Sequence, residues 1–510
     1  MRKVQQKLEK INRGDQLICF LSGAGGTGKS HVIKAVVKYA KNLCENLKVQ
    51  YTRRTIVVTA CTGSAAVSIR GETVHKAAVL NGTIKDKHIE EWKNAYMIIV
   101  DEISFAGKPE IQQLNTNLRA LMEQDHLKFG GLAVVFAGDF SQLRPVKFKV
   151  LYLEEEFEEW NGWVHTFYEL TTNHRFKSDP SWGNLLANYR TLGPSPSEVQ
   201  HINTRVLGSE GGPTADDIPS DVTYATKTNV DRMAINDGIF AEHLKATHSQ
   251  NPNDVPPMHT ICIKSSNLQW VKGRNEHDDF NPSMRDLFHA TVGEGHCTSS
   301  DSKTYDPMLK LYYGRPVMVN ENIDVSNGIA NGSMCKFVGV TLEDGVTYEH
   351  LERIRIDGYY VWSACVSQVK SLKVQVIDGL SNSDEIKFAD LKPGSKSVKA
   401  NIPIPLDGTV TKTTIRKKRR CRFNQFPLNC ANARTIHKLQ GRSLNAVVIT
   451  TWDYTDNWIY VALSRVRTLS GLFLRLPLQQ TKCRPMSVEV RTFMERLRAV
   501  GRPDFVEFDE

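Results

Sequence analysis

Long apolar runs, paired cysteines and a secretory leader are all missing from this sequence, and each absence excludes a class of protein. No apolar stretch approaches the roughly 20 residues of a membrane-spanning helix, so we expect no membrane association. The first residues, MRKVQQKLEK, carry charge where a signal peptide would carry an apolar segment. The ten cysteines form no C-x-x-C pair, which argues against zinc and for reduced thiols in an intracellular protein.

Acidic residues are outnumbered by basic ones, 56 against 65, which leaves a formal net charge of +9. A basic excess suits a polyanionic partner, because each phosphate that a cation neutralises releases counterions. Many mildly basic proteins have no such partner, so the charge alone decides nothing. Hydrophobic residues make up 40% of the chain, which excludes disorder as the default interpretation. At 510 residues we expect several domains, and the sequence contains no internal repeat.

The N-terminal part alternates between short β-branched runs and a helical pattern. We expect strands at residues 17–21, 55–60, 96–100 and 132–137. Between the first two, apolar residues have the spacing of a helix with one buried face: Val32, Ile33, Val36, Val37 and Ala40. This alternation predicts a parallel sheet covered on both faces, with ligands bound beyond the carboxyl ends of its strands.

The rest of the chain changes pattern twice. Residues 177–310 are harder to interpret, and residues 311–425 consist of short strands broken by Gly and Asn, typical of a small β-barrel. The α/β pattern returns in residues 426–510. We therefore expect a first α/β domain at residues 1–176 and a second one, 177–310 with 426–510, that a β-rich insertion interrupts.

The strongest motif is GAGGTGKS at residues 23–30, a phosphate-binding P-loop placed directly after a strand and before a helix. Its glycines let backbone N–H groups surround phosphates at the positive end of the helix. Lys29 is expected to reach the β- and γ-phosphates, and the Ser30 hydroxyl to bind Mg²⁺. The apolar strand YMIIV ends in Asp101 and Glu102, which can hold the magnesium and activate the attacking water.

A series of further segments narrows the choice among the families of P-loop ATPases. They are VTACTGSAA (58–66), GETVH (71–75), FGG (129–131), GDFSQLRPV (138–146), LTTNHRF (170–176), VMVNENIDVSNGIANG (317–332), FPLNCANARTIHKLQGRSL (426–444) and YVALSRVRTLSGL (460–472). In this order they resemble the petite-integration-frequency (PIF) DNA helicases, in the RecD-like branch of superfamily 1B, which includes the helicase regions of Helitron-type transposons. The resemblance runs from about Gln5 to Leu472.

The resemblance implies a role for each matching residue. The nucleotide is expected to contact Gln5 or Gln6, which read adenine, and Gly23, Gly25, Gly26, Thr27, Gly28, Lys29, Ser30 and Gly441. The catalytic set is Lys29, Asp101, Glu102, Gln142 as γ-phosphate sensor, and the arginines Arg175 and Arg465, with Ser30 and Asp101 holding Mg²⁺. Single-stranded DNA is expected to contact Thr62, Gly63, His75, Thr435, His437 and Lys438, the last three in a segment that also includes Gln440.

The same resemblance implies two RecA-like P-loop domains, the second interrupted by a small SH3-like β insertion. It implies an Mg²⁺- and ATP-dependent 5′→3′ DNA helicase that acts on single strands and on junctions with duplex, in DNA replication, repair or recombination. We expect a monomer, in a nucleus or mitochondrion if the protein is cellular and otherwise encoded by a virus or transposon. Two alternatives stay open: a translocase that unwinds weakly, and a non-catalytic transposon-derived scaffold that binds single-stranded DNA.

Two positions and one segment depart from the family pattern. Arg144 stands where a second proline is usual and could add a phosphate contact, and Leu439 replaces a small polar residue. More important, residues 77–93 leave little room for the small wedge element of the family. The short wedge region favours the translocase alternative.

Three weaker patterns have ordinary explanations. Residues 416–420, RKKRR, are interpreted as a solvated loop or a DNA contact rather than a nuclear localisation signal. A polar group with no standard metal-site spacing is interpreted as loop: His277, Asp278, His289, His296 and Cys297. An aromatic group near the C-terminal strands is expected to pack in the core rather than stack on bases: Trp452, Tyr454, Trp458 and Tyr460.

Overall fold

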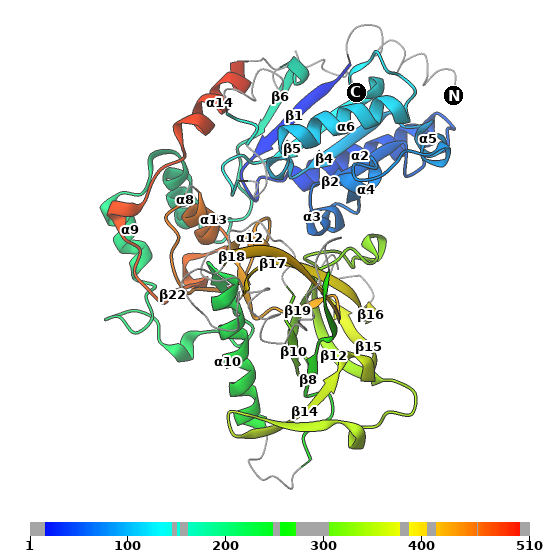
Figure 1. Cartoon of the computed structure of the whole chain (residues 1–510). Coiled ribbons are helices and arrows are strands. Elements are labelled where there is room, and N and C mark those ends of the chain that lie inside the picture. The colour runs from blue at the N-terminus through cyan, green and yellow to red at the C-terminus, as the bar shows by residue number, and fades with distance from the viewer. Residues whose placement is uncertain are drawn as a thin grey trace. The chain divides into compact units, whose positions relative to one another are not determined.

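The computed structural model describes residues 16–144, 150–153, 162–247, 255–271, 305–377, 387–404, 415–455 and 457–499. The chain forms two compact units (Figure 1). The first unit comprises Met1–Pro219, Val325–Asn327 and Leu439–Glu510; the second comprises Ser220–Asp324 and Gly328–Lys438. Within the described ranges, no helix is long and apolar enough to cross a membrane.

The first unit is built on a six-stranded sheet in the order β3-β2-β4-β5-β1-β6, with every pair parallel. Its strands are β1 (Ile18–Gly23), β2 (Ile56–Ala60), β3 (Glu72–Thr73), β4 (Met97–Asp101), β5 (Ala133–Gly138) and β6 (Thr166–Leu170). The four strands expected from the sequence are confirmed, each starting one residue later than expected. Parallel pairing brings the carboxyl ends of β1, β2, β4 and β5 to one edge of the sheet.

Helices cover both faces of this sheet, as the alternation predicted. In β4, Ile98 and Val100 belong to one apolar cluster and Ile99 to another, because successive side chains point to opposite faces. The Ile99 face packs against α2 (Lys29–Asn46) and α3 (Gly63–Ser68), and the expected apolar stripe of α2 lies in this cluster. The opposite face packs against α6 (Lys108–Leu121) and α14 (Val488–Ala499).

Shorter elements complete the first unit. They are α4 (Val74–Ala77), α5 (Asp86–Trp92), α8 (Pro180–Leu192), α9 (Pro196–Asn203), α13 (Trp458–Leu463), the parallel pair β21 (Val447–Ile449) and β22 (Leu472–Leu474), and the 3₁₀ turns η1 (Ile103–Phe105), η2 (Lys128–Gly131), η3 (Ala215–Asp217), η4 (Val325–Asn327), η7 (Leu469–Gly471) and η8 (Gln480–Lys482). Trp452, Trp458 and Tyr460 are buried here, so the packing interpretation is confirmed for these three aromatics.

The second unit is mainly β structure around a large apolar core, with smaller apolar clusters beside it. Two sheets contribute side chains to that core: a five-stranded antiparallel sheet, β16-β15-β12-β11-β19, and a four-stranded mixed sheet, β10-β8-β14-β13, in which β8 and β14 are parallel. A third sheet has the order β17-β18-β9, and β20 pairs with β7 in parallel. The bounds are β7 (Thr223–Thr226), α10 (Asn229–Thr247), β8 (Ile261–Lys264), β9 (Ser266–Val271), β10 (Met308–Leu311), β11 (Pro316–Val319), β12 (Met334–Leu342), η5 (Tyr348–His350), β13 (Glu352–Ile356), β14 (Tyr359–Cys365), η6 (Val366–Gln368), β15 (Val369–Val376), β16 (Phe388–Leu391), β17 (Gly394–Ile404), β18 (Ile415–Gln425), β19 (Leu428–Cys430), β20 (Ala433–Thr435) and α12 (Ile436–Leu439).

Two features of this unit differ from the sequence pattern. Strands β8 and β10 begin before residue 311 and still belong to the four-stranded sheet, so β structure starts earlier in the chain than the pattern indicated. Residues 416–420 lie within β18, antiparallel to β17 and β9, so the solvated-loop interpretation is wrong. Five consecutive charged residues show no alternation of apolar and polar positions, so the sequence gives no sign of a strand here.

Two groups of predicted residues lie outside the described residues. They are Gln5 and Gln6, and the five polar residues His277, Asp278, His289, His296 and Cys297. Across the part of the chain that the structure describes, no cluster of three or more His, Cys, Asp or Glu side chains could hold a metal ion.

Candidate active site

The P-loop connects β1 directly to α2, and its glycines are required by geometry. Gly26 and Gly28 have φ angles of +95° and +98°, a region that L side chains rarely adopt. A Cβ atom at Gly26 would lie 2.5 Å from Cβ of Arg175, and one at Gly23 would lie 2.4 Å from Oγ1 of Thr27. A side chain at either position would collide with its neighbour, so glycine lets the loop backbone approach these side chains closely.

Lys29 and Ser30, the first two residues of α2, stand at the positive end of that helix. The Lys29 side chain is buried, and its ammonium donates to the carbonyl oxygens of Gly23 at 2.6 Å and Ala24 at 3.3 Å. Burial raises the pKa of Asp101, and the positive charge of Lys29 opposes that rise. The lysine thus lies between the loop and the carboxylates, where it can reach an anion held by both.

The two predicted carboxylates lie at the end of β4. Glu102 adopts a left-handed backbone conformation, φ 55° and ψ 43°, which costs energy in a residue other than glycine and is frequent at active sites. Its N–H donates to Oδ1 of Asp101 at 2.9 Å. Burial, and then the neighbouring charge of Asp101, raise the pKa of Glu102 to about 7. A group with that pKa can exchange protons near neutrality, which suits a general base.

Arg465 is almost completely buried and held from several directions. Its Nε donates to the carbonyl of Val461 at 2.7 Å, and its Nη1 to the carbonyls of Leu439 at 3.2 Å and Arg442 at 3.0 Å. Its Nη2 donates to Oγ of Ser464 at 2.7 Å. The guanidinium is therefore fixed before any ligand arrives, and preorganised charge of this kind stabilises a phosphoryl-transfer transition state.

Arg175 brings a second, half-buried guanidinium to the P-loop. A Cβ atom at Gly25 would lie 3.1 Å from its Nη1, which also donates to the carbonyl of Ser464 at 2.9 Å. Burial lowers the pKa of both Arg175 and Arg465, and Arg175 lowers that of Arg465 further by repulsion. Two neighbouring guanidinium groups favour binding of a polyanion. Its negative charge would offset both the loss of hydration on burial and the repulsion between the two cations.

Two residues beside Arg175 hold the segment against the loop. Asn173 donates through Nδ2 to the carbonyl of Gly25 at 3.1 Å, and the His174 N–H donates to the carbonyl of Gly26 at 2.9 Å. These contacts were not predicted, although both residues stand within the LTTNHRF segment.

The segment after β5, residues 139–142, carries the predicted sensor Gln142. Asp139 accepts from the Ser141 N–H at 3.0 Å and from Nη2 of Arg190 at 3.2 Å. Burial would raise the pKa of Asp139, but Arg190, Lys29 and the bonds from Ser141 outweigh burial and lower it. Asp139 stands in the motif GDFSQ, whereas Arg190, on α8, has no local sequence signal.

Several buried polar atoms around the P-loop have no hydrogen-bond partner among the described residues. They are Oε2 of Glu102, Oε1 of Gln142, Nε of Arg175, and both amide atoms of Gln440. Gly441, next to Gln440, is close to the carboxylates, since a Cβ atom there would lie 3.4 Å from Oε1 of Glu102. Buried polar groups normally have a hydrogen-bond partner. The unpartnered donors and acceptors around this phosphate cradle could therefore be satisfied by a nucleoside triphosphate, its metal ion and a water molecule.

Three predicted DNA-contacting residues lie in the first unit. Thr62 caps α3 by accepting from the Ala65 N–H at 3.3 Å, and Gly63 is the first residue of that helix. The preceding residue, Cys61, donates through its N–H to the carbonyl of Asp101 at 3.0 Å. His75 lies 3.2 Å from Glu110 through Nε2. The Thr62 segment is thus joined to a predicted magnesium ligand through one backbone bond.

The remaining predicted DNA contacts belong to the second unit. Thr435 ends β20, and His437 and Lys438 lie in the short helix that follows. Lys438 donates to Oδ1 of Asn331 at 3.1 Å, within the same unit.

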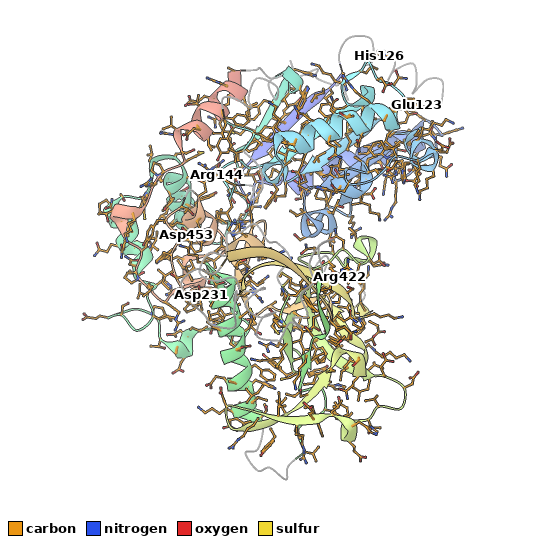
Figure 2. All side chains as sticks on the ribbon, in the orientation of Figure 1. Glu123, His126, Arg144, Asp231, Arg422 and Asp453 are labelled. Atoms are coloured by element: carbon orange, nitrogen blue, oxygen red, sulfur yellow. The ribbon has the colours of Figure 1, made fainter. Side chains whose placement is uncertain are left out.

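The two departures from the family pattern have distinct surroundings. Arg144, labelled in Figure 2, is exposed and lies with its guanidinium 5.9 Å from the ring centre of Tyr152. Leu439 is fully buried, and its carbonyl is one of the acceptors of Arg465. The backbone at position 439 therefore orients a candidate catalytic group, whichever side chain it carries.

Comparison with known proteins shows similarity to one helicase family. Residues 2–181 match the family model of the PIF1-like helicases. The chain is 24% identical to the ATP-dependent DNA helicase PIF1 of Saccharomyces cerevisiae, over 92% of this chain and 59% of that protein. The chain is related to the PIF1-like helicases. It is also 25% identical to the PIF1 of Xenopus laevis, over 96% of this chain and 64% of that protein.

The PIF1-like fold is confirmed by a solved structure. A Bacteroides Pif1 helicase in complex with ADP-AlF3 and single-stranded DNA superimposes with a TM-score of 0.60 at 20% identity, over 98% of this chain and 97% of that one. The expected α/β fold with RecA-like domains and parallel sheets is therefore confirmed, while the SH3-like form of the insertion stays a prediction. The chain spans about three fifths of the length of the PIF1 proteins from yeast and frog.

Proposed function

We propose that this chain is an ATP-dependent DNA helicase that moves 5′→3′ along single-stranded DNA and unwinds duplex. The observation that carries the proposal is the set of buried, unpartnered polar atoms around a P-loop that already holds a lysine, two carboxylates and two arginines. The PIF1 relatives support DNA as the partner, and the Bacteroides structure supports binding of both nucleotide and single strand. The polarity rests on the family alone.

The residues of the site divide the work of hydrolysis. The backbone N–H groups of the P-loop and Lys29 bind the β- and γ-phosphates of ATP. Ser30 and Asp101 would hold Mg²⁺, which when bound neutralises charge on the phosphate oxygens. Glu102 takes a proton from the attacking water as the bond between the β–γ bridging oxygen and the γ-phosphorus breaks. Arg175 and Arg465 balance the charge that gathers on the γ-phosphoryl group.

ATP hydrolysis is coupled to DNA binding through residues that lie close to the nucleotide site in the first unit. Gln142 senses the γ-phosphate from a segment that Arg190 and Asn457 hold, and Asn457 donates to the Gln142 carbonyl at 3.0 Å. Thr62, Gly63 and His75 contact the single strand, as do Thr435, His437 and Lys438 in the second unit. Contacts to the DNA backbone need no base sequence, so we expect little sequence preference. We further expect an intracellular monomer, with Gln5 or Gln6 reading adenine.

Steady-state ATP hydrolysis, with and without single-stranded DNA, tests the proposal. We expect stimulation on the order of tenfold or more, lost in Lys29→Ala and in Glu102→Gln, because both remove groups that act on the γ-phosphate. Binding of single-stranded DNA by the two variants should stay close to that of the parent. Slow hydrolysis that DNA does not affect would overturn the motor and leave a nucleotide-binding scaffold.

A second function is a translocase that displaces proteins from DNA but unwinds weakly. The observation that favours it is the packing of residues 77–93 against the first unit. Trp92 is buried and donates to the carbonyl of Ala77 at 3.2 Å, and Asn117 of α6 donates to the carbonyls of Ala78 and Val79. A segment bound in this way is unsuited to splitting a duplex. Comparing unwinding of a plain fork with displacement of a bound protein distinguishes the two functions.

A further inference from the structure

The position of the sensor segment, residues 139–142, depends on side chains rather than on regular structure. The segment leaves β5 and turns at Phe140, outside any helix or strand. Polar contacts from α8 and from Asn457 hold its flanks, since Arg190 donates to Ser141 Oγ at 2.8 Å and Asn457 to the Gln142 carbonyl at 3.0 Å. One further side chain of the segment, that of Phe140, is buried in the apolar core.

Among the described residues, Phe140 contacts aromatic rings from different parts of the first unit. Its ring centre lies 5.3 Å from that of Phe20 in β1, 6.1 Å from that of Tyr152, and 5.0 Å from that of Phe493 in α14. The contact with Phe493 is the closest and is edge-to-face, at 80° between the ring planes. An edge-to-face ring pair is stabilised by more than the apolar area that it buries. Phe493 therefore helps to fix the position of the Phe140 ring.

Helix α14 is itself firmly held against the first sheet (Figure 1). Val490, Met494 and Leu497 are buried beside Phe493 in the same core, at the spacing of one helical face. Near its end Arg498 makes a two-point ion pair with Glu169 of β6, at 2.8 and 2.9 Å. The phenyl ring of Phe493 is thus presented to Phe140 by a fixed helix.

We propose that Phe493 is a positioning residue for nucleotide sensing: through Phe140 it holds residues 139–142 so that Gln142 meets the γ-phosphate. The inference rests on the proposed ATPase function and adds α14 to its machinery. Gln142 lies two residues from Phe140 and has a buried oxygen without a partner in the described chain. A misplacement of about 1 Å at such a group costs on the order of 10²-fold in rate, even when the mutated residue is distant.

The test compares Phe493→Ala with Leu497→Ala. Both remove a buried side chain from the same face of α14 and the same core, but among the ring contacts of the described residues only Phe493 packs against Phe140 from this helix. Assays run well below the melting temperature of both variants. We expect Phe493→Ala to lower the kcat of DNA-stimulated ATP hydrolysis by 10- to 100-fold with the KM for ATP within about threefold. Leu497→Ala should keep kcat within about threefold, and Phe493→Tyr should restore most of the rate, because it retains the ring.

Hydrogen exchange provides a readout that needs no activity. We expect the amides of residues 138–144 to exchange faster in Phe493→Ala and to stay as in the parent in Leu497→Ala. An equal fall of kcat in the two alanine variants, or unchanged exchange in Phe493→Ala, would overturn the positioning role. A parent without DNA-stimulated hydrolysis would count against the proposed function, and the exchange comparison would still decide whether Phe493 positions the segment.

Discussion

A buried ion pair of the second unit and a buried arginine of the first unit are held in different ways. In the second unit, Arg232 and Asp306 are both buried and form an ion pair at 2.6 Å, and the buried Lys396 pairs with Glu321 at 2.7 Å. In the first unit, the hydrogen bonds of the buried Arg465 go to three backbone carbonyls and one hydroxyl. The Arg232–Asp306 pair neutralises its own charge within the core, whereas Arg465, which is held by neutral groups beside the P-loop, keeps a positive charge that an anionic ligand can meet.

We predict that Arg465→Gln abolishes ATP hydrolysis. Without the fixed positive charge, kcat for ATP hydrolysis should fall on the order of 10³-fold or more, because a transition-state arginine is typically worth 10³–10⁵. Steady-state hydrolysis at saturating single-stranded DNA measures this. The exposed Arg475→Gln, in the same unit, is the control and should keep the parental rate. If both variants were equally active, Arg465 would be structural and would not differ in role from the paired Arg232.

Breaking the paired charge should instead affect stability. Asp306→Asn leaves Arg232 buried without its counter-charge and should lower the free energy of unfolding by about 3–5 kcal/mol. Urea unfolding followed by circular dichroism measures it, with Glu352→Gln as the control. Glu352 pairs with Lys264 at 2.9 Å but is 72% exposed, so its replacement should leave the unfolding midpoint unchanged. A midpoint that moved equally in both variants would contradict the difference between buried and exposed pairs.

Replacing glycine by alanine should impair ATP binding at one position of the first unit and stabilise the fold at one position of the second. Gly26→Ala forces a Cβ atom within 2.5 Å of Cβ of Arg175 at a φ of +95°, so we expect the KM for ATP to rise at least tenfold. Gly238 lies in α10 with open space around it, and Gly238→Ala should raise the free energy of unfolding by about 0.5–1 kcal/mol. Nucleotide titration and urea unfolding check the two outcomes. Normal ATP use by Gly26→Ala would show that the loop tolerates a side chain.

The smallest effect is expected from the basic strand β18 of the second unit. Replacing Arg416 and Lys418 by Gln should weaken binding of single-stranded DNA and flatten its salt dependence, by about 0.7 in log–log slope for each phosphate that the protein no longer neutralises. The kcat at saturating DNA should not change, because the ATP-binding residues lie in the other unit. Fluorescence anisotropy over a series of salt concentrations measures the slope. An unchanged slope would remove β18 from the DNA-binding surface.

What could be predicted from the sequence was local. The P-loop, Asp101 with Glu102, and the four strands each depend on a few consecutive residues, and the structure places them within one residue or two of expectation. The contacts of Arg190 with Asp139, and of Asn457 with Gln142, join residues far apart in the chain and left no local pattern. The loop interpretation of residues 416–420 is wrong for another reason: a run of five charges lacks the alternating pattern of a strand, although the strand before it in the chain pairs with it.

Helix α14 also has a consequence for how the protein is made. The sheet of the first unit is complete at residue 170, yet its core still lacks Val490, Phe493, Met494 and Leu497. During synthesis on the ribosome, the apolar surface around Phe20 and Phe140 therefore stays uncovered while more than 300 further residues are made, until α14 emerges. At roughly 5–20 residues per second that interval lasts about 15 s to 1 min, long enough for chaperones to bind the half-finished domain.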